Sequence, residues 1–346
     1  MIEVDCYLKE ERLGLHSSYK AVLVAPASRI ANLSLAGYWK RHIRVITSTW
    51  LCAALKPLTI QKILHYDIHR YGSVIGQTAE FPLIQKRWGD RSPVLSLQPA
   101  DVIRGEERLR ELGIPDSAWF VCVHSREGGY SPHDEQTHSY RNSEIDSYVP
   151  AMSAIIARGG WCIRMGDPSM KKLAPMQKVI DYAHHPLRAD WMDLFLCARC
   201  RFFLGNSSGI YLVAAAFGVP VALANLLPVS AALPYGKRDL GIPKSLWSLA
   251  EQRLLTYPEI LSSPVGNMRF SREYEQAGIR VIDNTGEDIL ELALEQMEIT
   301  GDGARYTAAD QELQVRFKAL MKPGHYTYES DSRIGRNFLR KHNALL

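Results

Sequence analysis

The sequence predicts an α/β protein with two Rossmann-like domains that face each other across a crevice. Short apolar runs typical of buried strands alternate with amphipathic stretches typical of helices, through two successive halves of the chain. The 346 residues, of which 46% are hydrophobic and 23% charged, suit about two globular domains. Polar strings also follow three of the apolar runs, which places them at the carboxyl edge of a sheet, where ligands bind.

The first half, residues 1–115, begins with an apolar run at 20–25 that we predict as a buried strand. A helix at 32–41 and a second strand at 42–47 follow it. The remaining predicted elements are a short helix at 49–54, strands at 63–68, 74–75 and 94–97, and an amphipathic helix at 101–112. Gly113 and Pro115 end this last helix, and we place the domain boundary there.

The second half, residues 116–325, opens with an apolar strand at 118–123. Further strands are predicted at 161–165, 179–182, 201–204, 219–224 and 280–283, and helices at 148–158, 210–217, 287–297 and 308–321. Another helix begins near Asp190, its predicted N-cap, and a long loop is predicted at 225–245. Apolar strands alternating with helices are typical of a parallel sheet. The C-terminal segment 326–346, helical from 334, could pack back on the first domain.

Composition and charge exclude several classes of function. The net charge of +4 comes from scattered basic residues rather than a clustered stripe, which argues against nucleic acid as a partner. A mildly basic chain can still favour anionic substrates or surfaces, so peripheral membrane contact stays open. No apolar stretch reaches the roughly 18 residues of a membrane span, and the N-terminus does not resemble a signal peptide. We therefore expect a cytoplasmic protein.

His124, Arg126 and Glu127 follow the strand at 118–123. Arg126 could bind a phosphate through two parallel N–H groups of its guanidinium. His124 can carry a proton near neutral pH. Glu127 is either a general base or the residue that orients Arg126. The structural alternative is a surface ion pair beside a buried histidine.

Two further polar strings lie in the same half of the chain. Arg141 and Asn142 end the run 137–142, whose side chains suit a phosphate or sugar hydroxyls, although a solvated loop would have the same composition. Arg164, Gly166 and Asp167 end the strand at 161–165. Gly166 permits a tight turn, and Asp167 could either bind ribose or sugar hydroxyls or cap a turn.

The string Gly205-Asn206-Ser207-Ser208-Gly209 joins a predicted strand to an apolar helix. Its small residues let a ligand approach the backbone, and the first amides of the helix point outward, so it suits a diphosphate. The hydroxyls of Ser207 and Ser208 can donate to phosphate oxygens, and Asn206 could position sugar or ribose hydroxyls. The alternative is an ordinary turn in which one of the two serines caps the helix.

Metal motifs are weak in this sequence. His65 and His69 have H-x-x-x-H spacing, but they lie in a predicted strand, where four residues span about 13 Å and cannot share one ion. No D-x-D motif and no phosphate-binding Walker loop occurs. We therefore expect neither a metal nor another cofactor.

Four phrases between residues 119 and 227 carry a resemblance as a series: W-F-V-C-V-H-S-R-E-x-G-Y, H-S-Y-R-N, G-G-W-C-I-R-M-G-D-P-S-M and R-F-F-L-G-N-S-S-G. The series resembles a little-characterised bacterial glycosyltransferase family with GT-B-like architecture. His124-x-Arg126 is also distantly similar to the H-x-R element of GT-B fucosyltransferases, whose arginine contacts the donor diphosphate. Those enzymes usually continue with a second arginine, whereas Glu127 follows here. The resemblance implies that the second domain holds a nucleotide sugar and the first domain holds the acceptor.

Together, these features predict a metal-independent glycosyltransferase that moves a sugar from a nucleotide-sugar donor to a saccharide or other hydroxyl acceptor, in glycan, glycoconjugate or metabolite biosynthesis. Arg126 and the turn 205–209 would neutralise the leaving diphosphate, with help from Arg141 or Arg164.

The general base is left open between His124 or Glu127 and a residue of the first half, Asp67 or His69. The alternative functions are a pyruvyl transferase or a sugar-nucleotide epimerase on the same scaffold, or a non-catalytic module that binds nucleotide sugars.

Overall fold

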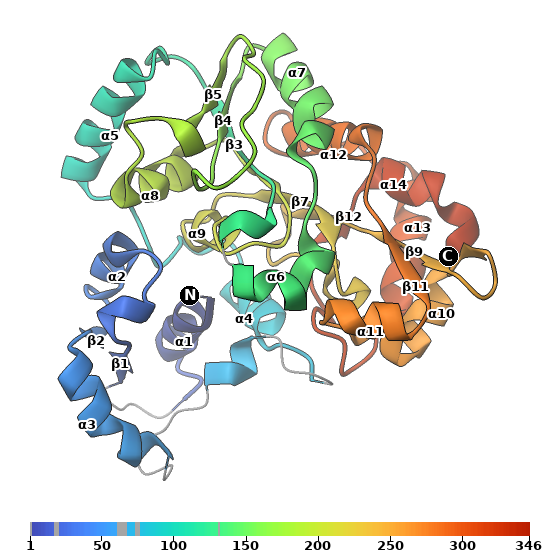
Figure 1. The fold of residues 1–346 in the computed structure, drawn as a ribbon, viewed down its shortest axis with the longest axis horizontal. Coiled ribbons are helices and arrows are strands. Elements are labelled where there is room, and N and C mark those ends of the chain that lie inside the picture. Colours follow the sequence, from blue (N-terminus) through green and yellow to red (C-terminus); the bar gives the residue numbers. More distant parts are fainter. Residues whose placement is uncertain (1, 17–20, 61–67, 73–76, 131) are drawn as a thin grey trace.

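A parallel sheet of seven strands forms the centre of the computed structural model, which describes residues 2–16, 21–60, 68–72, 77–130 and 132–346 (Figure 1). The order is β12-β8-β7-β6-β3-β4-β5, and neighbouring strands are parallel. The strand bounds are β3 (Phe120–His124), β4 (Trp161–Arg164), β5 (Val179–Asp181), β6 (Phe203–Gly205), β7 (Val221–Leu226), β8 (Leu240–Pro243) and β12 (Arg333–Ile334). The strand order reverses between β3 and β6, and such a switch point is where open α/β sheets bind ligands.

Helices cover both faces of this sheet, which explains why its strands are apolar throughout. On β3, Val121 and Val123 point into one core, while Phe120 and Cys122 point into the other. The first core is closed by α7 (Val149–Ala157), α12 (Gly286–Ile299), α13 (Ala308–Ala319) and α14 (Arg336–Lys341). The second is closed by α5 (Pro99–Glu111), α8 (Asp190–Arg199) and α9 (Tyr211–Ala216). The predicted α/β class with a large parallel sheet is therefore confirmed.

The N-terminal part differs from its prediction. It contains α1 (Ile2–Arg12), β1 (Val22–Val24), α2 (Leu33–Trp39), β2 (Arg44–Ile46), α3 (Thr49–Ile60) and α4 (Phe81–Trp88). Within the described residues of 1–115, the strands are β1 and β2, which form a two-stranded parallel sheet. Apolar side chains of α1, α2 and α4 join the core beneath α8 and α9, so this part shares a core with the large sheet. The described residues thus do not show a second Rossmann-like domain.

Two predictions in this part concern single strands. The predicted strand at 94–97 is wrong, because Val94 and Leu95 bury their side chains in the shared core without pairing to a neighbouring strand. The predicted strands at 63–68 and 74–75 lie outside the described residues except for Ile68, which begins the 3-10 helix η2 (Ile68–Tyr71).

The predicted loop at 225–245 is also wrong, because it contains the end of β7 and the whole of β8. The Gly and Pro of β8 are typical of turns, yet all of its residues are buried. A small antiparallel sheet, β10-β9-β11, follows. Its strands are β9 (Ser245–Ser248), β10 (Arg253–Leu254) and β11 (Ile279–Ile282), and α10 (Tyr257–Ser262) and α11 (Ser271–Gln276) lie between β10 and β11.

The C-terminal segment makes two sets of contacts. Helix α14 packs against α12 and α13 and buries Phe338 and Leu339 in their core. The segment before it reaches the N-terminal part, where the Tyr326 carbonyl accepts a hydrogen bond from the Ala79 amide at 3.1 Å. Within the described part of the chain, no helix is both long and apolar enough to cross a bilayer.

Candidate functional site

A cavity of about 390 Å³ opens at the carboxyl edge of the large sheet, beside the switch point. Ser207, Ser208 and Gly209, which follow β6, line one side of it. Residues that follow β7, among them Pro228, continue this wall. The N-terminal part contributes a further wall, which includes Glu3 of α1. The cavity therefore lies between the ends of the central strands and the N-terminal helices.

Two arginines give this cavity an affinity for anions. Arg141 donates from Nε and Nη2 to the Ser207 carbonyl, at 3.2 and 2.8 Å, so its guanidinium is fixed against the turn after β6. Burial lowers the pKa of Arg141, but a guanidinium stays charged in a protein. Arg269 lies on the same lining, 5.4 Å from the centre of the Tyr326 ring. Glu3 is the one acidic residue among the described residues of the lining.

Aromatic rings and a free hydroxyl complete the lining. The Tyr211 and Tyr235 rings stack with centroids 6.0 Å apart, and Phe81 contacts the Tyr235 ring edge-on at 4.0 Å. Ser208 is only 8% exposed, and its buried Oγ has no hydrogen-bond partner among the described residues. A buried hydroxyl without a partner is costly, so a ligand oxygen or nitrogen in the cavity would satisfy it.

The predicted residue Arg126 does not line this cavity. Its guanidinium forms an ion pair with Asp134 at 2.8 Å and donates to the Asn142 side chain. Asp134 belongs to α6 (Pro132–His138), in a stretch predicted as a loop, and Asn142 directly follows the 3-10 helix η4 (Ser139–Arg141). Asn142 also donates to Glu135 at 2.7 Å. Arg126 therefore holds in place the segment that carries Arg141 to the cavity.

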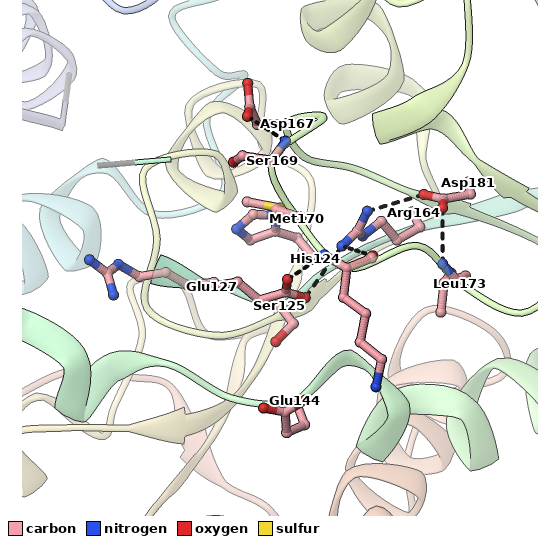
Figure 2. A network of polar contacts seen from close by, with 12 residues as sticks. His124, Ser125, Glu127, Glu144, Arg164, Asp167, Ser169, Met170, Leu173 and Asp181 are labelled. Atoms are coloured by element: carbon pink, nitrogen blue, oxygen red, sulfur yellow. Dashed lines mark hydrogen bonds and ion pairs between the residues drawn. The ribbon is translucent and has the colours of Figure 1, made fainter. Parts of the chain in front are cut away.

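Glu127 and Arg164 belong to a separate buried network (Figure 2). Arg164 is fully buried, with ion pairs to Asp181 at 3.1 Å and to Glu127 at 3.4 Å. It also donates to the Lys171 carbonyl at 3.0 Å, while Glu127 accepts from the Lys171 amide at 2.6 Å. These contacts hold the loop after β4 against the ends of β3 and β5. Neither Arg164 nor Glu127 lines the cavity. The ion pair of Glu127 with Arg164 is thus buried, whereas the structural alternative for the string 124–127 is a surface ion pair.

Gly166 and Asp167 shape the turn after β4. A β carbon on Gly166 would lie 2.5 Å from the Met170 sulfur, so only glycine fits this position without a shift. Asp167 accepts a hydrogen bond from the Ser169 amide at 2.9 Å, as in an Asx turn. Burial alone would raise the pKa of Asp167, but the hydrogen bonds from Ser169 and the nearby Arg188 outweigh it and lower that pKa.

His124 is buried and neutral. Its Nδ1 donates to the Met165 carbonyl at 3.1 Å, which leaves Nε2 as the acceptor nitrogen. Burial, helped by the positive charges of Arg164 and Arg126, lowers the pKa of His124 to about 4. As a base, it is therefore weak near neutral pH, and its visible role is to join β3 to the turn after β4.

In the string 205–209, the first two residues pack inside the fold and the last three line the cavity. A β carbon on Gly205 would lie 2.6 Å from the His124 carbonyl, so this glycine allows β6 to approach β3. Asn206 is fully buried, accepts from the Arg126 amide at 2.9 Å and donates to the Arg141 carbonyl at 3.0 Å. Only the three residues after it reach the cavity.

The helix after this string begins at Tyr211, one residue after its predicted start. Helix α9 has Ile210 as its N-cap residue and no side-chain cap, so neither serine caps it. Helix α8 also lacks a side-chain cap. Its N-cap residue is Ala189, and the predicted N-cap Asp190 is instead the first residue of the helix.

Of the other candidates, His65 and Asp67 lie outside the described residues, and the side chain of His69 is not described. Among the described residues, no group of three or more His, Cys, Asp or Glu side chains could hold a metal ion. The residues that sequence reasoning missed are Glu3, Tyr211, Tyr235, Arg269 and Tyr326. They come from segments far apart in the chain, and no local motif marks them.

Comparisons with known proteins add two distant structures. No family model matches the chain, and no curated protein matches it. The glycosyl transferase family 9 protein from Veillonella parvula has a TM-score of 0.28 and 12% identity, over 62% of this chain and 60% of its own length. The dodecameric iron-containing heptosyltransferase TibC, solved with ADP-D-β-D-heptose, has a TM-score of 0.30 and 14% identity, over 64% and 62%. This chain thus spans less than two thirds of either protein.

Proposed function

We propose that the protein is a glycosyltransferase that binds a nucleotide-sugar donor in the cavity beside the switch point. The observation that carries this proposal is the lining itself, in which Arg141 and Arg269 stand with the unpartnered hydroxyl of Ser208 and several aromatic rings. Arginines suit a diphosphate, and tyrosine rings suit a base or a sugar ring. The phrases at 119–227, which resemble a glycosyltransferase family, support the same function.

In this mechanism the two guanidinium groups neutralise the diphosphate as it leaves, a task that a metal ion performs in other transferases. The transfer is therefore metal-independent. Arg126 is a positioning residue, because its side chain holds the 134–142 segment while its amide is held by Asn206. Asn206 joins this support to the backbone of Arg141.

The acceptor hydroxyl approaches from the N-terminal wall of the cavity, opposite the strand ends. Glu3 is the carboxylate on that wall among the described residues, so it is our candidate for the general base. His124 is less suited to this role, because its buried ring has a pKa of about 4.

One observation favours a second function, a non-catalytic module that binds nucleotide sugars. Arg126 and Arg164, which were expected to bind the donor, and Glu127, a candidate general base, all have protein partners instead. A binding module needs the cavity but not a set of reactive groups beside it.

The experiment is a calorimetric titration with UDP, GDP, ADP and dTDP, followed by their nucleotide sugars. Arg141→Ala should weaken the best nucleotide by about 1.5–3 kcal/mol, about tenfold to a hundredfold, because a charge-assisted hydrogen bond is lost. Arg158→Ala, at an exposed position after α7, is the matched control and should bind as the wild type does.

The outcomes separate the alternatives. Nucleotide binding with no sugar transfer and no donor hydrolysis supports the binding module. Isomerisation of the nucleotide sugar without an acceptor indicates an epimerase, and consumption of phosphoenolpyruvate indicates a pyruvyl transferase. If Arg141→Ala is folded and binds the nucleotide as tightly as the wild type, the cavity is not the donor site.

A further inference from the structure

Helix α3 exposes apolar side chains to solvent. Trp50 is 75% exposed and Leu51 is 41% exposed. Cys52 is buried, and its thiol donates a hydrogen bond to the Ile46 carbonyl of β2, which holds the helix to that strand. Ala54 adds to the exposed apolar surface. In Figure 1, α3 lies at the edge of the molecule beyond β1 and β2, away from the large sheet. Tryptophan at such a position is typical of a protein or membrane contact.

The chain around α3 is basic and contains no acids. Between residues 13 and 66 there is no aspartate or glutamate. The described Lys and Arg residues of this stretch are all exposed: Arg29, Lys40, Arg41, Arg44 and Lys56. The outer surface is therefore positive.

Apolar and basic residues are mixed on this part of the fold. Val22 of β1 is 43% exposed and is the register partner of Arg44 on β2, which leads directly into α3. A surface of this composition repels a second copy of itself, because both copies carry the same charge. It also differs from a nucleic-acid site, where an exposed apolar helix gains nothing from phosphate contacts.

We propose that α3, together with these exposed basic residues, docks the protein on an anionic membrane surface. Trp50 and Leu51 enter the headgroup region, and the lysines and arginines lie against lipid phosphates. Apolar insertion and electrostatic attraction are the two contributions that reversible peripheral binding combines. The inference does not depend on the proposed transferase activity, because it concerns a different surface.

The test is flotation of the full chain with vesicles of phosphatidylcholine alone and of phosphatidylcholine mixed with phosphatidylglycerol. We expect binding to the mixed vesicles only. The double variant Trp50→Ser/Leu51→Ser should reduce the partition coefficient by about tenfold or more, and Lys56→Glu by about fivefold or more. The matched control Leu249→Ser/Val315→Ser removes two other exposed apolar side chains and should bind as the wild type does.

A second readout locates the inserted residue. Brominated lipid should quench part of the tryptophan fluorescence of the wild type, and this part should be absent in Trp50→Phe. The proposal is overturned if the chain stays unbound with anionic vesicles, or if the α3 double variant floats like the control. It is also overturned if the double variant instead converts a dimer to a monomer in the absence of lipid, since α3 would then be a contact between copies.

Discussion

Replacing Arg164 by methionine distinguishes a residue that holds the fold from one that binds the donor. Removing one partner of a buried ion pair typically costs about 3–5 kcal/mol, because the remaining charge is uncompensated. Here the carboxylates of Glu127 and Asp181 are 19% and 20% exposed, so water would partly solvate them. In addition, Arg164 Nε has no hydrogen-bond partner among the described residues, so part of the cost of burying this guanidinium is recovered on its removal. We expect the free energy of unfolding to fall by about 2–3 kcal/mol.

Urea denaturation followed by circular dichroism measures this change. Arg158→Met, at an exposed position one element away, should change the free energy of unfolding by less than about 0.5 kcal/mol. The folded Arg164→Met protein should keep the nucleotide affinity of the wild type, because Arg164 does not line the cavity. A variant that is as stable as the wild type but no longer binds nucleotide would refute this reasoning and make Arg164 a donor ligand.

Three further predictions concern stability and are measured by urea unfolding. Burial lowers the pKa of His124 from 6.5 to about 4, so the unfolded chain binds more protons in this range and the wild type loses up to about 3 kcal/mol as the pH falls through it. His124→Asn should show a shallower loss, and equal slopes would contradict the assignment. Burial raises the pKa of Asp193 to about 7, so the wild type loses stability as the pH rises from about 4 to 7. Asp193→Asn should therefore gain about 1–3 kcal/mol at a pH of about 8 and little at a pH of about 4, and a gain equal at both would rule this out. Gly205→Ala should lose more than about 2 kcal/mol, because its β carbon would meet the His124 carbonyl, whereas Gly209→Ala, with nothing within 4 Å, should change by less than about 0.5 kcal/mol. Similar losses at both glycines would count against the close approach of β6 to β3.

The strands that the sequence predicted best are those of the central sheet. The apolar runs at 118–123, 161–165, 201–204 and 219–224 all contain strands of this sheet, because a strand buried on both faces needs an uninterrupted apolar run. Strands β8 and β12 were not predicted. They are two to four residues long and carry Gly or Pro at or beside them, so their pairing depends on neighbouring strands rather than on local pattern.

The candidate site was predicted in part. The sequence placed the serines at 207–208 at the end of a strand and Arg141 in the loop run 137–142, and all three residues line the cavity. It did not distinguish Arg126 and Arg164, which have carboxylate partners, from Arg141, which does not. Arg269 lines the same cavity although it lies more than a hundred residues after Arg141 in the chain, and no local sequence pattern indicates that it belongs to the site.

By itself, the sequence determined the apolar strands of the central sheet other than β8 and β12, and that polar groups follow several of them, because hydrophobic periodicity acts between near neighbours in the chain. Tertiary structure alone decided which of those groups stay available. A guanidinium is neutralised when the fold brings a carboxylate to it, as Asp181 at the end of the neighbouring strand β5 does for Arg164, and it stays available to a cavity when no carboxylate lies beside it. That choice depends on contacts between residues remote in sequence.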